Sequence, residues 1–461
     1  MKKIKVGFLP LYVKLYDDVV PGLRPRLEAF YETMAKKLEE QGMDVVRAPF
    51  CRLEGEFLKT VADFEEAGAQ CIVTLHMAYS PSLECVKALT ETTLPIVIMD
   101  TTETYGFDPM VDPDELMYNH GIHGVMDMCN LLLRNSKQYA IAAGHYLHSD
   151  VVERTCGYVR AAVAAHAVNG IKVGTYGGEF AGMGDFQAGK RELMEWFGID
   201  LMEADDEEIK AIRAAITDAE VDAEIAFDDA NYERAEELNE TNYRENTKDC
   251  LTIRKWIDKH GLNAFSMNFL KFTAESGLKS VPFLEACKAM TRGIGYAGEG
   301  DALDAAIMGA IYKAYDQASF CEIFCPDWKG NSFMISHMGE MNYAVSDIKP
   351  QLNNVAFNYT NAAAPVVGYA KFRGGKAIYA NICRDAEGYC MVITPIEMLD
   401  VKEDSFKKSM RGWFKPSTTV ADLLECLSIY GATHHSLLIY DASVEEIEYF
   451  ATLLGMKVIT L

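Results

Sequence analysis

Four short stretches carry side chains that could bind a metal ion or move a proton. GYAGEGDALDA presents Glu299 between glycines, just before a helix-like segment. SFCEIFC sets Glu322 in an apolar run, and ISHMGEMN has His337 at the end of another. YGATHHSLLIY contains the adjacent pair His434 and His435. Two carboxylates and two imidazoles without a thiolate form an oxygen and nitrogen donor set. Such a set suits Mn²⁺, Co²⁺ or a similar ion and disfavours structural zinc.

Each stretch also has an ordinary explanation when it is taken alone. A glycine-rich loop that opens a helix could cradle phosphate, but Glu299 repels phosphate and no lysine follows. The loop could equally be a turn with a helix cap. Glu322 could point to water from an alternating strand, because burying an unpaired carboxylate is costly. His337 and the His434–His435 pair could be hydrogen-bonded core residues. Side chains alternate along a strand, so only one of the two adjacent histidines is expected to face a given site.

The elements that must position these residues follow from hydrophobic patterning. The first third of the chain alternates short apolar runs, typical of buried strands, with amphipathic stretches, typical of helices. This alternation predicts a parallel sheet that is covered on both faces. The expected strands are 4–12, 43–50, 71–77 and 94–100, and the expected helices are 22–42, 80–92 and 121–135.

A second α/β pattern starts near residue 172, with a strand at 263–269 and a helix at 301–317. Beyond 320, strands separated by short turns predict an antiparallel, barrel-like domain. Its expected strands are 333–338, 354–360, 366–372, 376–385 and 388–398, and helices at 418–431 and 442–455 flank the strand that follows the histidine pair. The predicted fold is α/β, with two parallel-sheet (Rossmann-like) α/β domains followed by an antiparallel β-rich domain. The domains are expected at 1–171, 172–319 and 320–461.

The amino-acid composition argues against several classes of binding partner and indicates where the protein is located. The 461 residues include 44 Lys and Arg against 68 Asp and Glu, a formal net charge of −24. This sign argues against nucleic acid and anionic membranes as partners. No apolar run reaches the ~18 residues of a membrane span. Twelve cysteines are scattered without a CxxC pair, which indicates reduced thiols and a cytoplasmic protein.

The order of the four motifs, GYAGEGD, SFCE, SHMGE and GATHHS, resembles the L-arabinose isomerase family, which groups with L-fucose isomerase. The resemblance covers most of the chain. LHMAYSP resembles the family segment with an aromatic residue before Ser-Pro, and NHGIHGVMDMCNLL resembles its Asn-x-x-x-His-Gly helix. NAFSMNF and GLKSVPFLEACKAM resemble the stretch that leads to the glycine-rich loop.

The resemblance implies a ligand set and an assembly. Glu299, Glu322, His337 and one histidine of the pair, with His435 favoured, would bind a divalent ion. That ion is usually Mn²⁺, with Co²⁺ or Mg²⁺ as alternatives. The family fold has two α/β domains and a barrel-like C-terminal domain. Its members are homo-trimers or homo-hexamers with sites between subunits. Substrate-lining positions would be His434, Tyr79, His120, His123, Phe269 and Met338.

The function that the resemblance implies is reversible aldose–ketose isomerisation of an unphosphorylated sugar through a cis-enediol. Glu299 and Glu322 would move the proton, which is general acid–base catalysis. Two other functions stay open on the same fold: a sugar-binding protein with altered catalysis, and a sugar epimerase.

Two segments depart from the family pattern. LPLYVKLYDD stands where a Ser-Gln-His-Leu-Tyr type segment is expected; Leu15 and Tyr16 match, and Val13 replaces the glutamine. NNVAFNYTNAAAPVVGYAKFRGG stands where the family has His-Pro-Leu-Gly-Ile-Gly-Gly. Both changes fall on substrate recognition, so the identity of the sugar does not follow from the resemblance.

Overall fold

The computed structural model describes residues 3–461, and the chain forms two compact units, Met1–His166 and Ala167–Leu461. All four candidate ligands lie in the second unit. The finer division of the chain at residues 171 and 319 stays a prediction.

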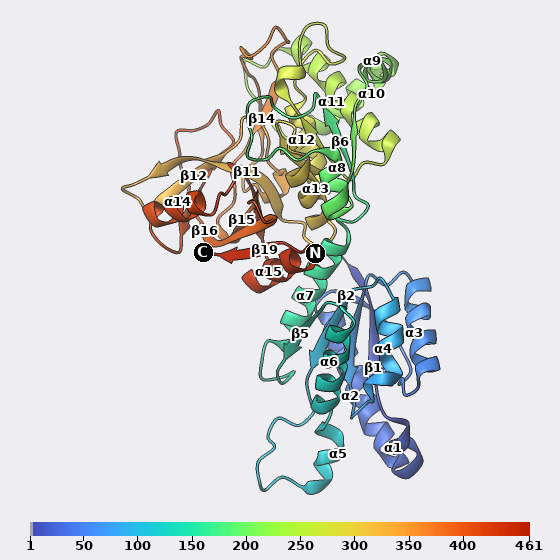
Figure 1. The fold of residues 1–461 in the computed structure, drawn as a ribbon. Coiled ribbons are helices and arrows are strands. Elements are labelled where there is room, and N and C mark those ends of the chain that lie inside the picture. Colours follow the sequence, from blue (N-terminus) through green and yellow to red (C-terminus); the bar gives the residue numbers. More distant parts are fainter. Residues whose placement is uncertain (1–2) are drawn as a thin grey trace. The chain divides into compact units, whose positions relative to one another are not determined.

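The first unit is built on a five-stranded parallel sheet in the order β2-β1-β3-β4-β5. β3 is buried along its whole length, as expected for a parallel sheet covered on both faces. The predicted parallel sheet is therefore confirmed (Figure 1). Its strands are β1 (Ile4–Leu11), β2 (Met43–Arg47), β3 (Cys71–His76), β4 (Ile96–Asp100) and β5 (Tyr139–Ala143).

Helices cover this sheet on two sides. α3, α4 and α6 contact one another or the sheet around a core that includes Leu9, Ile72 and Ile98. α2 and α7 contact each other and the strands β2 to β5. The helices are α1 (Lys14–Val19), α2 (Arg24–Glu40), α3 (Glu54–Glu66), α4 (Ser82–Glu91), α5 (Leu116–Asn119), α6 (Ile122–Arg134) and α7 (Val151–His166).

The second unit begins with a four-stranded sheet in the order β10-β9-β6-β7, in which all pairs are parallel. This confirms the second predicted parallel sheet. Its strands are β6 (Lys172–Tyr176), β7 (Asp200–Glu203), β9 (Ala264–Met267) and β10 (Gly295–Gly298). Its helices are α8 (Lys190–Phe197), α9 (Asp206–Ala215), α10 (Asp218–Asn231), α11 (Glu240–His260), α12 (Phe283–Thr291) and α13 (Ala302–Ile311).

A closed antiparallel barrel follows. Its strands run in the order β15-β18-β11-β12-β17-β16, and β16 pairs with β15 to close the ring. β19 adds to the free part of the β16 edge in parallel. The predicted barrel-like domain is confirmed. The elements are β11 (Ala318–Asp327), β12 (Ser332–Ser336), β15 (Gly375–Arg384), β16 (Tyr389–Met398), β17 (Gly412–Pro416), α14 (Val420–Ile429), β18 (His435–Tyr440), α15 (Val444–Leu453) and β19 (Lys457–Thr460).

One predicted strand is wrong. Of residues 354–360, only Asn354 belongs to a strand, β13 (Gln351–Asn354), which pairs in a small sheet with β14 (Val366–Tyr369) and β8 (Glu233–Arg234). The segment 355–365 is irregular because its polar groups bond to the loop at 272–279 instead of a neighbouring strand. The Ala363 amide donates to the Lys279 carbonyl at 2.8 Å, and the Ala274 amide donates to Asn361 Oδ1 at 2.9 Å.

None of the helices in residues 3–461 is long and apolar enough to cross a membrane. The twelve cysteines form no disulfide in this part of the chain. Eleven of the twelve are buried or half-buried, and Cys325 is exposed.

Candidate active site

The register of the barrel strands brings three of the candidate ligands together: Glu322, His337 and His435. β11 pairs with β18 so that Glu322 lies directly opposite His435. Residues directly opposite in an antiparallel pair share one face of the sheet. On its other edge Glu322 lies opposite Ser336, the last residue of β12, and His337 follows at once. One potential ligand atom from each of Glu322, His337 and His435 lies within 4.8 Å of the others.

Glu299 reaches the site from the parallel sheet. β10 ends at Gly298, so Glu299 stands at the carboxyl end of that strand, where ligands of open α/β sheets bind. Its φ is +63°, a left-handed conformation that is uncommon for a residue other than glycine. The Glu299 amide donates to the Met267 carbonyl at 2.9 Å, and its carbonyl accepts from the Phe180 amide at 2.9 Å. Such over-determined local strain is typical of functional sites.

Glu299 belongs to a second donor cluster, with His434 and His435, whose ligand atoms also lie within 4.8 Å of one another. Oε2 of Glu299 lies 3.5 Å from Nε2 of His435 and 3.6 Å from Nε2 of His434. His435 is therefore the residue that the two clusters share.

The expectation that the adjacent histidines face opposite sides is wrong. β18 begins at His435, so His434 lies outside the strand and the alternation rule does not apply to it. The two rings are 4.3 Å apart between centroids, and both turn Nε2 towards Glu299. They differ in burial instead, because the His435 side chain is 0% exposed and that of His434 is 39% exposed.

Carboxylates behind the two buried imidazoles orient them. Nδ1 of His435 lies 2.9 Å from Oδ2 of Asp301, and Nδ1 of His337 lies 2.6 Å from Oε2 of Glu340. Metal-binding histidines commonly engage a carboxylate through one ring nitrogen and leave the other for the ion. Nε2 of His435 is buried and has no hydrogen-bond partner within residues 3–461, and a bound cation would supply one. The donor set therefore fits a divalent metal.

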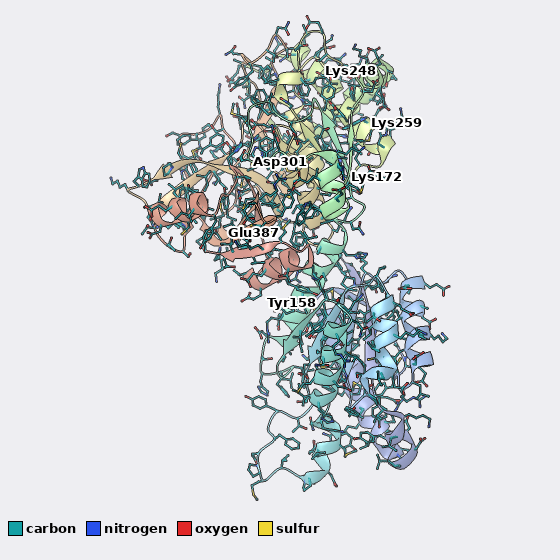
Figure 2. All side chains as sticks on the ribbon, in the orientation of Figure 1. Tyr158, Lys172, Lys248, Lys259, Asp301 and Glu387 are labelled. Carbon is teal, nitrogen blue, oxygen red and sulfur yellow. The ribbon has the colours of Figure 1, made fainter. Side chains whose placement is uncertain are left out.

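The carboxylate of Asp301, which is labelled in Figure 2, makes two separate contacts. Its Oδ1 accepts from the Asp304 amide at 3.0 Å and so caps helix α13. Its Oδ2 holds Nδ1 of His435. One buried carboxylate thus fixes both the start of the helix and the orientation of the shared histidine.

Asp301→Asn is expected to weaken divalent-metal binding about 10- to 100-fold, the usual cost of losing an outer-shell partner. Asparagine caps helices as well as aspartate does, but it has one side-chain oxygen where Asp301 uses two, so it cannot hold the Asp304 amide and His435 through separate oxygens. Calorimetric titration with Mn²⁺ measures the effect. The matched control is Asp205→Asn at the cap of α9, which should bind Mn²⁺ as the wild type does. Unchanged affinity in Asp301→Asn would contradict the orienting role.

The loop that carries Glu299 lies against the second imidazole. A Cβ on Gly298 would come within 2.7 Å of Cε1 and 3.1 Å of Nε2 of His337, so only glycine allows this approach. Phe320 packs edge-on to His337 and His435, at centroid distances of 4.7 and 4.9 Å. These contacts leave the two imidazoles little freedom to rotate.

The electrostatics of the protein alone favour a cation at this place. Burial opposes the charged form of His435, but the hydrogen bond to Asp301 and the nearby carboxylate of Glu299 outweigh it and raise its pKa to about 10. Burial would raise the pKa of Glu299, but its contacts with the two adjacent histidines outweigh burial and lower that pKa to about 2. Burial raises the pKa of Glu322. Protons and a metal ion would compete for the same negative surroundings.

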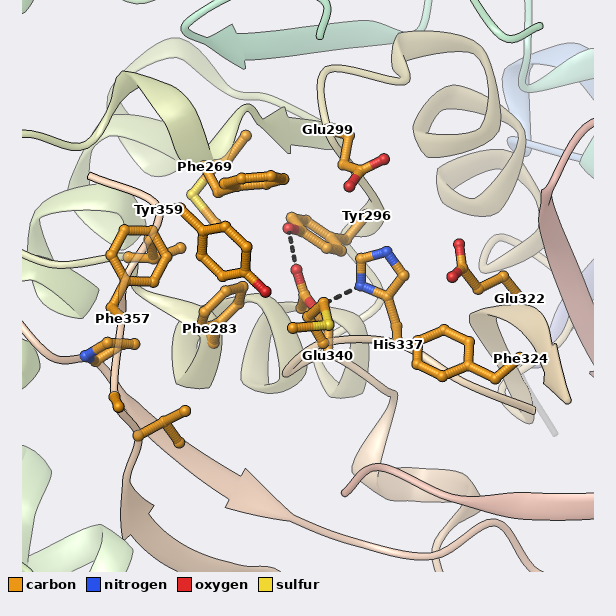
Figure 3. A pocket seen from close by; sticks show the side chains of 16 residues that line it. Phe269, Phe283, Tyr296, Glu299, Glu322, Phe324, His337, Glu340, Phe357 and Tyr359 are labelled. Atoms are coloured by element: carbon orange, nitrogen blue, oxygen red, sulfur yellow. Dashed lines mark hydrogen bonds and ion pairs between the residues drawn. The ribbon is translucent and has the colours of Figure 1, made fainter. Parts of the chain in front are cut away.

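A cavity of about 320 Å³ opens beside the donors and is lined by Glu299, Glu322 and His337. Figure 3 shows Glu322 on one side of it and a group of aromatic rings on the other. Phe269 and Met338, which the sequence predicts as substrate-lining residues, are part of its wall. Among residues 3–461, no lysine or arginine lines this cavity.

Three of the predicted substrate residues, Tyr79, His120 and His123, lie in the first unit, where they form a cluster of their own. Tyr79 stacks on His123 with centroids 5.0 Å apart, and His120 lies 5.3 Å from His123. Nε2 of His120 is 2.9 Å from the hydroxyl of Tyr16. Their role in substrate binding stays a prediction.

Family models match almost all of the second unit. The model of the L-arabinose isomerase central domain matches residues 176–316, and that of the C-terminal domain matches residues 317–457. The chain belongs to the L-arabinose isomerase family. L-arabinose isomerase of Aeromonas salmonicida (strain A449) is 22% identical over 100% of this chain and 95% of its own length. That of Shouchella clausii (strain KSM-K16) is 23% identical over 99% of this chain and 93% of its own. That of Bacillus subtilis (strain 168) is 23% identical over 86% of this chain and 81% of its own length.

Membership of the L-arabinose isomerase family makes this chain a sugar isomerase of the aldose–ketose type, an intramolecular oxidoreductase. The identities near 22% leave room for a different sugar.

Sequence reasoning missed several residues of this arabinose isomerase-like site. The sequence motifs assign no role in orienting a ligand to Asp301, Glu340 or Tyr296. Glu340 accepts from the Tyr296 hydroxyl at 2.7 Å as well as contacting His337. Asp185, which lies 2.7 Å from Nδ1 of His434, carries no signal in the sequence. The spacing His-x-x-Glu in SHMGE was the one available indication of the His337–Glu340 contact.

Proposed function

We propose that the chain is a metal-dependent isomerase that interconverts an aldose and a ketose of an unphosphorylated sugar through a cis-enediol. The observation that carries the proposal is that His435 belongs to both donor clusters, one with Glu299 and one with Glu322 and His337. Two carboxylates that share one neighbouring imidazole suit proton transfer next to a bound ion. The described part of the chain places no lysine or arginine in the cavity wall, which favours a substrate without phosphate.

Glu299, Glu322, His337 and His435 would hold the ion, and their oxygen and nitrogen donors suit Mn²⁺, with Co²⁺ or Mg²⁺ as alternatives. A divalent ion in this position supplies Lewis-acid stabilisation of the negative charge that develops on the substrate oxygens. His337 and His435 would bind through Nε2, because a carboxylate engages Nδ1 of each.

The glutamates would move the proton. One carboxylate takes the proton from the carbon beside the carbonyl, and the electron pair of that C–H bond becomes the carbon–carbon double bond of the enediol. The carbonyl oxygen gains a proton and becomes a hydroxyl. Returning a proton to the former carbonyl carbon, while the neighbouring hydroxyl loses its proton and becomes the new carbonyl, completes the isomerisation. Glu299 and Glu322 have opposite pKa shifts, which suits a pair with one member ionised and one able to carry a proton.

Other predicted residues would bind the sugar. His434 lies beside Glu299 and half-exposed, where it can donate to a substrate hydroxyl. Phe269 and Met338 would contact carbon–hydrogen faces of the chain, and we propose Tyr79, His120 and His123 as further substrate contacts. We also propose a cytoplasmic homo-trimer or homo-hexamer with sites at subunit interfaces, by likeness to the family.

The test is to incubate the purified chain with Mn²⁺ and a panel of pentoses, hexoses and deoxyhexoses and to follow the products by NMR in D₂O. We expect one aldose to yield its ketose. We expect EDTA to abolish turnover and added Mn²⁺ to restore it, with a control in which Mg²⁺ and Co²⁺ replace Mn²⁺. Deuterium at C2 without a ketose would favour an epimerase. Sugar binding without conversion would favour a binding protein.

A further inference from the structure

The cavity beside the donors has two chemically different ends. Glu299, Glu322 and His337 form the polar end. Figure 3 shows Phe269, Phe283, Phe357 and Tyr359 grouped away from Glu322, whereas Phe324 lies beside it. We call this the apolar end, and it consists of Phe269, Val281, Phe283, Val355, Phe357, Tyr359 and Pro365.

Aromatic rings of the apolar end meet at steep angles. Phe269 and Tyr359 have centroids 5.1 Å apart with planes at 61°, and Phe357 and Tyr359 have centroids 5.3 Å apart at 66°. A single flat ring can stack on one face of a sugar and leave its hydroxyls in water. Rings at steep angles, joined by valine and proline, instead enclose a group from several sides. Such a surface suits a group without hydroxyls.

Two polar side chains beside the apolar end, Tyr296 and Glu340, already have partners. The hydroxyl of Tyr296 donates to Oε1 of Glu340 at 2.7 Å. Oε2 of Glu340 accepts from the Gly339 amide at 2.8 Å and lies 2.6 Å from Nδ1 of His337. A substrate hydroxyl buried here would lose water without gaining any of these side chains as a partner, and an unmade hydrogen bond weakens binding.

Much of the apolar end comes from the segment in which this sequence departs from the family motif. Val355, Phe357, Tyr359 and Pro365 all lie in the irregular stretch 355–365. That stretch is fixed by bonds to the loop at 272–279 and not by a strand ladder. The apolar end is therefore formed largely by a segment that differs in sequence from the family motif.

Resting on the proposed isomerase function, we infer that the substrate is a terminally deoxygenated aldose. Its carbonyl and neighbouring hydroxyl carbon lie at the polar end, and its terminal methyl group lies in the apolar end. A hydrophobic pocket commonly distinguishes ligands that differ by one such group about 10- to 200-fold.

The test compares sugars that differ only in the terminal hydroxyl, with Mn²⁺ present. The pairs are L-fucose with L-galactose, L-rhamnose with L-mannose, and 5-deoxy-L-arabinose with L-arabinose. We expect kcat/KM to be at least about 10-fold higher for the deoxy member of each pair that reacts. Equal values, or a preference for the hydroxylated member, would overturn the inference.

Binding separates this inference from the proposed function. Calorimetry with unreactive alditols compares L-fucitol with galactitol and L-rhamnitol with L-mannitol. We expect Kd to be at least about 10-fold lower for the deoxy alditols. That preference without turnover of any sugar would support the inference and count against the isomerase. Turnover of a sugar with equal alditol affinities would support the isomerase and count against the inference. If no sugar is converted and no alditol binds, both are overturned.

A substitution in the apolar end tests whether this surface causes the preference for deoxy sugars. Val355→Thr keeps the side-chain shape and adds a hydroxyl to the apolar end, so the preference for the deoxy member should fall about 2- to 10-fold. The control is Val458→Thr in β19, which is also partly exposed and does not line the cavity, and it should keep the full preference. An undiminished preference in folded Val355→Thr would show that the discrimination arises elsewhere.

Discussion

Replacing either Glu299 or Glu322 with glutamine is expected to lower kcat by at least ~10²–10⁴-fold, the contribution of general acid–base catalysis. Glutamine has nearly the same size and keeps a hydrogen-bonding oxygen, but it cannot take up and return a proton. It also removes a negative charge from the surroundings of the ion. The two variants should be equally inactive if the carboxylates act as a pair.

Activity is measured by NMR at saturating Mn²⁺, so that weakened metal binding does not limit the rate. Circular dichroism and the melting temperature report whether the fold is kept. The control is Glu207→Gln, whose side chain is 81% exposed and which should retain full activity. A wild-type kcat in either folded site variant would refute the assignment of that glutamate.

His435→Ala is expected to abolish stoichiometric Mn²⁺ binding, whereas His434→Ala should keep it within about 10-fold, the lower range of outer-shell effects. The reason is position: His435 is fully buried, belongs to both donor clusters and is oriented by Asp301. His434 is half-exposed and touches only Glu299 of the proposed ligands besides its neighbour.

Metal content after dialysis and calorimetric titration measure the difference. His435→Gln is a second variant that fills more of the space in case alanine unfolds the barrel. Retained binding in both His435 variants, together with loss in His434→Ala, would reverse the choice between the two histidines.

The sequence predicts the fold well where local patterns decide it. Continuous apolar runs such as 71–77 become buried parallel strands, because both faces of their sheet are covered. The stretch 354–360 has a similar run of apolar residues but becomes a loop. Thr360 and, just after it, Asn361 and Ala363 bond to residues 272–279, about 90 positions earlier. A local sequence pattern does not reveal such a distant partner.

The donors could be found from the sequence, because Glu299, Glu322, His337 and the histidine pair stand in short recognisable motifs. Their arrangement could not. It depends on which residue lies opposite Glu322 in the barrel, and strand register is a tertiary property. The two hydrogen bonds of the Asp301 carboxylate also depend on the closed fold. So does the contact between Asp185 and His434, which are 249 residues apart in the sequence.

The measurement that tests the central claim most directly is anomalous X-ray diffraction at the manganese edge from crystals of the chain grown with Mn²⁺. The account predicts one strong peak within coordinating distance of Glu299, Glu322, His337 and Nε2 of His435. A peak elsewhere, or none at full Mn²⁺ saturation, would contradict it.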